Sequence, residues 1–148
     1  MAANQNKVLS GGKADGLTKR ITTARTAVAV IASPADAVDL RLLFTAGTNG
    51  GFIDQLAYQF VGTGTQLATL IYFWITDTAG ANAQIMPNLI QAIAAGSAMS
   101  NTVKGQSGVI YPPFENYAAG RVVYASVSVL SASCELIVEA KGGQFEAQ

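Results

Sequence analysis

The chain has 148 residues, the length of one compact domain; half of them are apolar and 12% are charged, well below the roughly 25% of an average soluble protein. This composition excludes disorder over most of the chain. Nine basic and nine acidic side chains give zero net charge, which argues against nucleic-acid binding, while the lack of histidine and the single cysteine exclude Ser-His-Asp and Cys-His catalysis, Cys/His zinc sites and intrachain disulfides.

The first 25 residues differ from the rest in charge. They contain Lys7, Lys13, Lys19, Arg20 and Arg25 against Asp15 alone, so this segment carries about +4 and the remaining chain about −4. Large apolar residues are few here, and no apolar stretch typical of a secretory signal is present. We therefore predict an extended basic arm over residues 1–21, followed by one domain over residues 22–148. A terminus without a role is the alternative.

Alternating apolar residues, typical of strands, begin after the arm. Residues 38–46 place Val38, Leu40, Leu42, Phe44 and Ala46 on one face. The turn Gly-Thr-Asn-Gly-Gly follows at 47–51, and residues 52–61 then place Phe52, Leu56, Tyr58 and Phe60 on one face. We predict a hairpin formed by these two strands.

Residues 67–76 are apolar on both faces. Leu67, Ile71, Phe73 and Ile75 alternate with Leu70, Tyr72 and Trp74. A sandwich strand needs only one apolar face, so the second face must be covered by another segment or by another subunit. We expect a homo-oligomer, with a trimer favoured, whose interface contains Leu70, Tyr72 and Trp74.

Further strands are expected in the second half of the chain. Residues 83–95 suit a short helix through Ile85, Leu89, Ile90 and Ile93, but Pro87 and the neighbouring turns favour an edge strand. Residues 97–108 are polar and contain glycine, so we predict a connection there. Two more strands follow: residues 121–130 with Val123, Ala125, Val127 and Val129 on one face, and residues 135–140 with Leu136 and Val138 inward, a parity that Cys134 shares as a buried, unreactive side chain.

Seven or eight short strands with glycine-rich turns predict the fold. We expect an all-β protein with a single β-sandwich or jelly-roll domain and an extended N-terminal arm. Matching parity along the strands predicts a core formed by Leu40, Leu42, Phe44, Leu56, Phe60, Ile71, Phe73, Val127, Leu136 and Val138.

The residues offer little chemistry. The carboxylates Asp54, Asp77, Glu115, Glu135 and Glu139 lack the spacing of a calcium loop, and a glycosidase pair would need a polar, aromatic cleft for which the chain has few residues. The aromatic residues could stack on glycans or bases, but none lies beside a basic cluster, so packing is the favoured use. We expect no enzyme activity, cofactor, metal, small-molecule substrate, nucleic acid or membrane partner; no run reaches the 18 apolar residues of a membrane helix.

Two stretches resemble small structural proteins of tailed bacteriophages. The first is Ala-Gly-Thr-Asn-Gly-Gly-Phe-Ile-Asp at 46–54; the second combines residues 118–128 with Leu-Ile-Val-Glu-Ala-Lys-Gly-Gly at 136–143. The resemblance is to the capsid decoration, or cement, protein family, whose members are small β-sandwich proteins that often bind the capsid as trimers at local three-fold positions. The long apolar run at 67–76 departs from the family pattern.

The resemblance implies a structural virion protein, made in the host cytoplasm and located on the capsid surface. Its partners would be copies of itself and the major capsid protein, and the arm cations Lys7, Lys13, Lys19, Arg20 and Arg25 would contact the capsid. Two alternatives are a phage tail or adaptor component and a glycan-binding fibre-like domain. A charge-poor domain with an apolar second face supports association in its own right, because burying that face contributes roughly 25 cal/mol per Å².

Overall fold

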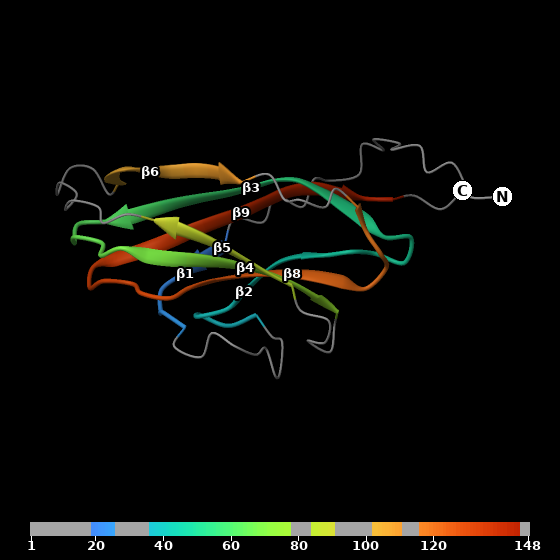
Figure 1. Cartoon of the computed structure of the whole chain (residues 1–148), viewed down its shortest axis with the longest axis horizontal. Helices are drawn as coiled ribbons and strands as arrows, with labels where there is room; N and C mark the ends of the chain where they lie inside the picture. Colours follow the sequence, from blue (N-terminus) through green and yellow to red (C-terminus); the bar gives the residue numbers. More distant parts are fainter. Residues whose placement is uncertain (1–18, 26–35, 78–83, 91–101, 111–115, 146–148) are drawn as a thin grey trace.

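A computed structural model describes residues 19–25, 36–77, 84–90, 102–110 and 116–145 (Figure 1). The regular secondary structure of these residues is entirely β, and none of them belongs to a helix that could cross a membrane. The nine strands are β1 (Lys19–Ile21), β2 (Arg41–Thr45), β3 (Gly51–Gly62), β4 (Thr69–Asp77), β5 (Gln84–Ile90), β6 (Thr102–Ile110), β7 (Asn116–Tyr117), β8 (Arg121–Val127) and β9 (Cys134–Gln144).

The strands form two antiparallel sheets that pack face to face. The five-stranded sheet has the order β1-β9-β3-β6, with β7 also pairing with β3, and the four-stranded sheet has the order β2-β8-β4-β5. β1 pairs with β9, β2 with β8, β3 with β6 and β4 with β5, so the first half of the chain runs back along the second. These four antiparallel pairs form one long ribbon. The ribbon is rolled up, so that β3 also pairs with β9 and β4 also pairs with β8. The topology is that of a jelly roll, which confirms the predicted all-β sandwich.

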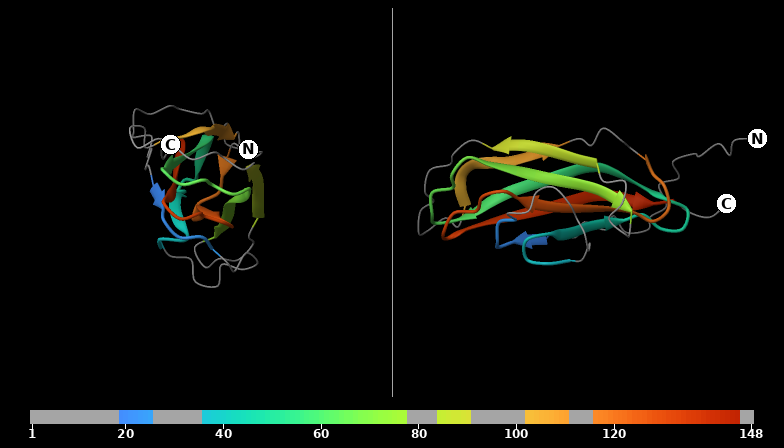
Figure 2. Two further views of the ribbon diagram at one scale, coloured as in Figure 1. Left: turned by 90° about the vertical axis from the view of Figure 1, so that its left-hand side faces the viewer. Right: turned by 60° about the horizontal axis from the view of Figure 1, so that its bottom comes forward.

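The strands run along the length of the molecule, which is longer than it is wide (Figure 2). The positions of β2 and β3 correct the predicted hairpin. β2 lies in the four-stranded sheet and β3 in the five-stranded sheet, so the glycine-rich turn between them crosses from one layer to the other. The sequence pattern of a hairpin and that of a sheet-crossing turn are alike, because in both cases each strand buries one face.

The core between the sheets contains most of the predicted residues. Phe44, Leu56, Phe60, Ile71, Phe73, Val127, Leu136 and Val138 are all buried there. Leu40 is buried as predicted, but in a second cluster outside this core, and the prediction is wrong for Leu42, which is only half-buried. A β-bulge shifts the register of β2 between Leu42, opposite Tyr124, and Phe44, opposite Val123. The extra residue reverses the alternation, so Leu43 and Phe44 enter the core while Leu42 lies on the outer side.

A second bulge alters β3. The register against β9 shifts between Ile53 and Gln55, and Ile53 rather than Phe52 joins Leu56 and Phe60 in the core. Phe52 instead packs on Phe145, with 5.8 Å between the ring centroids. The predicted face of this strand is therefore correct from Leu56 onward and wrong at its start.

Of the remaining strands, β5, β8 and β9 agree with the prediction except at their ends, whereas most of β6 falls in a predicted connection. β5 is an edge strand, as Pro87 suggested, while residues 91–95 lie outside the described residues. The predicted connection at 97–108 is wrong from Thr102 onward, because β6 pairs with β3 at the sheet edge, where polar residues and glycine are tolerated. β8 ends at Val127, so Val129 is not inward; it lies in the following loop and is exposed. β9 extends past residue 140 to Gln144.

The two stretches that carry the family resemblance meet at one end of the sandwich. In the β3–β9 register Phe52 lies opposite Gly143 and Ile53 opposite Gly142. A Cβ on Gly142 would lie 2.0 Å from the Phe52 carbonyl oxygen, so no other residue fits there. The Ala46 N–H donates to the Arg121 carbonyl at 2.7 Å, which ties the turn to β8 as well. The close approach of the backbones therefore explains why these motifs contain such residues.

Candidate interaction surfaces

The first surface is the root of the predicted arm. Lys19–Ile21 form β1, whose residues pair with Leu136–Val138 of β9, and the Ile21 side chain is fully buried in the core. The predicted boundary after residue 21 is thus wrong, because the domain already includes Lys19. Lys7 and Lys13 lie outside the described residues.

Asp36 fastens β1 to the opposite sheet. Its carboxylate accepts hydrogen bonds from Lys19 Nζ at 2.9 Å and from the Leu42 N–H at 3.1 Å, and Arg41 Nη1 lies 3.6 Å away. Arg41 Nε also donates to the Arg20 carbonyl at 2.7 Å. Burial by itself raises the pKa of Asp36, but the hydrogen bonds and the charges of Lys19 and Arg41 together lower it. The carboxylate therefore links the edges of the two sheets.

Three of the predicted arm cations have acidic partners within the chain. Lys19 pairs with Asp36, Arg25 pairs with Asp39 at 3.1 Å, and Arg20 pairs with Glu135 at 2.8 Å. The Arg20 side chain is the most accessible of them, with 59% of its surface exposed. Capsid contact by these cations stays a prediction, but the basic excess around β1 is largely balanced locally.

The outer face of the four-stranded sheet holds a second apolar cluster. Trp74, Leu40, Val122 and Tyr124 are buried in it, and Leu42 and Tyr72 pack against it half-buried. Trp74 is 0% exposed, and its indole N–H donates to Ser126 Oγ at 2.8 Å. Other segments of the same chain therefore cover Trp74, and its side chain is not exposed in a single copy.

This finding narrows the predicted oligomer interface. The second face was expected to be covered either by another segment or by another subunit, and at Trp74 it is covered by segments of the same chain. Leu70 and Tyr72 remain half-buried and accessible to a partner, and Leu42 from β2 is half-buried on the same outer face. Burial, and to a lesser extent the charge of Asp36, raises the pKa of Tyr124 in the same cluster. An interface at Leu70, Tyr72 and Trp74 stays a prediction, with Trp74 as its support beneath the surface.

The loops β3–β4 and β8–β9 are cross-linked at one end of the sandwich. The fully buried Gln66 amide donates to the Leu67 carbonyl at 2.9 Å and to the Val129 carbonyl at 3.0 Å, and accepts from the Ser131 N–H at 3.1 Å. The Ser128 hydroxyl accepts from the Leu70 N–H at 3.0 Å. A buried glutamine outside any periodic pattern gives no sequence signal, so these loops were not predicted to be ordered.

Two apolar side chains project from these loops. Leu67 is 59% exposed and Val129 is 39% exposed. Both flank the Gln66 amide through their carbonyl groups. The hydrogen-bond network thus holds an exposed apolar pair in place, which reduces the ordering entropy of a contact there.

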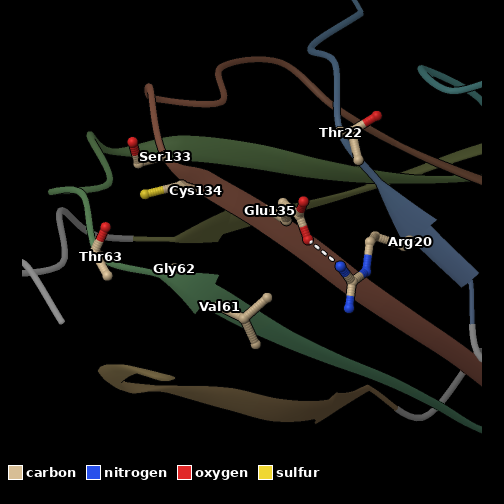
Figure 3. A pocket seen from close by; sticks show the side chains of 8 residues that line it. All are labelled: Arg20, Thr22, Val61, Gly62, Thr63, Ser133, Cys134 and Glu135. Atoms are coloured by element: carbon tan, nitrogen blue, oxygen red, sulfur yellow. Dashed lines mark ion pairs between the residues drawn. The ribbon is translucent and has the colours of Figure 1, made fainter. Parts of the chain in front are cut away.

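A hollow of about 310 Å³ lies beside the same loops, on the outer side of the five-stranded sheet (Figure 3). Arg20 from β1 reaches across it to Glu135 of β9. The lining residues are Arg20, Thr22, Val61, Gly62, Thr63, Ser133, Cys134 and Glu135.

The backbone around the hollow is unusual. Ser133 has a positive φ of 60°, and Gly62 has φ of 130°, where a Cβ would lie 2.0 Å from the Ser133 carbonyl oxygen. That carbonyl accepts from the Thr63 N–H at 3.1 Å. Burial raises the pKa of the Cys134 thiol, with partial opposition from a backbone hydrogen bond to Gly64, so the thiol is protonated at neutral pH. The predicted burial of Cys134 is confirmed.

The carboxylates considered from sequence are not gathered into a site in the described part of the chain. Within that part, no group of three or more Asp, Glu, His or Cys side chains is positioned to hold a metal ion. Glu115 lies outside the described residues. Comparison with known proteins gives no relative: no family model, no curated protein and no solved structure matches the chain.

Proposed function

We propose that this chain is a structural protein of a tailed-bacteriophage virion, which binds the outer surface of the capsid and stabilises the shell. The observation that carries the proposal is the outer face of the four-stranded sheet. It has an apolar cluster supported by buried Trp74, with Leu42, Leu70 and Tyr72 left half-exposed in a single copy. A domain that retains such a face in a charge-poor surface is suited to association.

The partner of this face is a second copy of the chain, in a closed trimer. Closed cyclic symmetry covers the same patch in every copy and leaves no free patch to drive further growth. The five-stranded sheet is the less suitable face, because its outward positions include the charged residues Glu135, Glu139 and Lys141.

The arm before β1 provides the contact to the major capsid protein. Lys7 and Lys13 supply its cations, and attraction through them alone is weak, since exposed charges are screened over about 10 Å at 0.1 M salt. The contacts of Asp36 support this role. They anchor β1, which directly follows the arm, to both sheets, so an arm bound to the capsid would be attached to the whole domain.

The test is binding of the purified chain to capsids that lack it. We expect saturation at a fixed fraction of the copies of the major capsid protein, together with a higher temperature of shell opening. A variant that starts at Thr18 lacks most of the arm but keeps β1. It should fold like the full chain and bind the capsid more weakly. A handful of copies per particle would instead assign the chain to the tail or neck, and an absence of binding would contradict the proposal.

A further inference from the structure

The hollow beside the β3–β4 and β8–β9 loops has the size of a small ligand site. Its volume of about 310 Å³ lies at the lower end of the roughly 300–1,000 Å³ typical of small-molecule sites. It therefore suits a single ring rather than an extended chain. Nothing in the capsid role proposed above uses it.

The lining groups combine hydrogen-bond donors and acceptors without net charge. Arg20 and Glu135 form an ion pair at 2.8 Å, and the lining also includes three hydroxyl side chains, Thr63 and Ser133 at the loop end of the hollow and Thr22 next to β1. Figure 3 shows the ion pair and the two loop hydroxyls at different ends of the hollow, and among the described lining residues Val61 presents an apolar side chain. Hydroxyls can both donate and accept, whereas the guanidinium only donates and the carboxylate only accepts.

This chemistry excludes several ligand classes. Glu135 repels an anion and offsets the single cation, and Arg20 does the same to a cationic ligand. A wholly apolar molecule would desolvate the ion pair and the hydroxyls without replacing their hydrogen bonds. A ring that carries several hydroxyl groups satisfies both donors and acceptors, and its C–H surface can lie on Val61.

The site is also preformed. The Ser133 carbonyl accepts from the Thr63 N–H, and the Ser133 backbone has a positive φ, so the backbones of the two loops are tied to each other. Buried Gln66 cross-links the same two loops from the other side. Binding consequently requires little ordering of the protein.

We propose that this hollow binds one neutral sugar residue, as the terminal unit of a glycan. We expect a millimolar affinity, because the hollow is open and none of the lining residues that the structure describes is aromatic. A virion decorated with many copies would gain surface attachment from many such weak contacts. The inference stands independently of how the chain binds to the capsid.

The test is an NMR titration of the full-length chain with glucose, galactose, mannose and N-acetylglucosamine, with glycerol and N-acetylneuraminic acid as controls. We expect saturable shifts of the Thr63, Ser133 and Glu135 amides with at least one neutral sugar. Thr63→Val should weaken that binding about fivefold, which is the effect of one lost hydrogen bond. Thr65→Val is the matched control: Thr65 is exposed two residues further on and does not line the hollow.

Several outcomes would overturn the proposal. These are no saturable shift with any of the four sugars, shifts confined to other parts of the chain, or equal weakening by Thr63→Val and Thr65→Val. Equal shifts with glycerol would reduce the site to unspecific hydroxyl binding. Tighter binding of N-acetylneuraminic acid than of the neutral sugars would contradict the charge argument.

Discussion

The two sheets of the jelly roll differ on their outer faces. In the described strands β3 and β9, the outer face of the five-stranded sheet carries polar residues such as Gln55, Gln59, Glu135, Glu139 and Lys141, together with the smaller apolar set Ala57, Val61 and Ile137. The four-stranded sheet is apolar outside, where Trp74 and Tyr124 build a second cluster. Both sheets contribute side chains to the core between them, so the difference lies in their outer faces. We propose that the first face binds a small ligand and that the second face associates with another copy of the chain.

The largest expected effect comes from the buried centre of the apolar face. Trp74→Ala should lower the free energy of unfolding by about 3–5 kcal/mol, because it removes a fully buried ring and leaves a cavity. That is a large part of the roughly 5–15 kcal/mol available to a domain. Chemical denaturation measures it, with the half-buried Tyr72→Ala as control. An unchanged midpoint for Trp74→Ala would mean that the cluster does not support the single chain.

Loss of β1 should cause the second-largest decrease in stability, because it removes an edge strand of the five-stranded sheet. A chain that starts at Thr22 lacks buried Ile21, the pairing with β9 and the Lys19–Asp36 and Arg20–Glu135 contacts. Burying one isoleucine side chain contributes about 1.5–3 kcal/mol, so thermal unfolding should begin at a clearly lower temperature. The chain that starts at Thr18 is the control. Equal stability of the two truncated chains would show that β1 is dispensable.

Prediction from sequence succeeded in some strands and failed in others. The alternation in β8 and β9 identified Val123, Ala125, Leu136 and Val138 as core residues, because no bulge interrupts those strands there. Alternation failed around Leu42, because one inserted residue exchanges the faces of a strand without leaving a signal in a single sequence.

Long-range contacts were the other source of error. The burial of Trp74 depends on Leu40 and Tyr124, which are distant in sequence, and the strand character of Lys19–Ile21 depends on pairing with β9. The hollow joins side chains from β1, β3 and β9, so no local motif could have identified it. Among the proposed site residues that the structure describes, Leu70 and Tyr72 are half-buried and Arg20 is exposed, as a contact with a partner requires.

A smaller effect is expected at the junction of the two sheets. Asp36→Asn should cost about 1 kcal/mol or less at neutral pH, since its ion pairs are partly solvent-screened. The folded-state pKa of Asp36 is lowered, so its contribution is present above its ordinary value of 3.8 and is lost as the pH falls below it. The stability difference between the two proteins should therefore shrink in acid. A difference that grows below pH 3.8 would contradict this assignment.

The smallest effect should have the opposite sign. The Tyr117 hydroxyl is buried without a hydrogen-bond partner among the described residues, so Tyr117→Phe should leave stability unchanged or raise it by up to about 1 kcal/mol. Burial, opposed by the charge of Arg121, raises the pKa of Tyr117 to about 12. The raised pKa contributes stability that is complete below pH 10 and is lost as the pH approaches 12. Stability at pH 11 should fall less in the variant; an equal fall would refute the assignment.

The difference between the two faces is tested most directly by the mass of the protein in solution. Sedimentation equilibrium of the unmodified chain should give three times the mass of one chain at micromolar concentration. Tyr72→Glu on the four-stranded sheet should give a folded monomer, while Gln59→Glu on the five-stranded sheet should leave the trimer intact. A monomer from the unmodified chain, or an oligomer that survives Tyr72→Glu and dissociates with Gln59→Glu, would contradict the account.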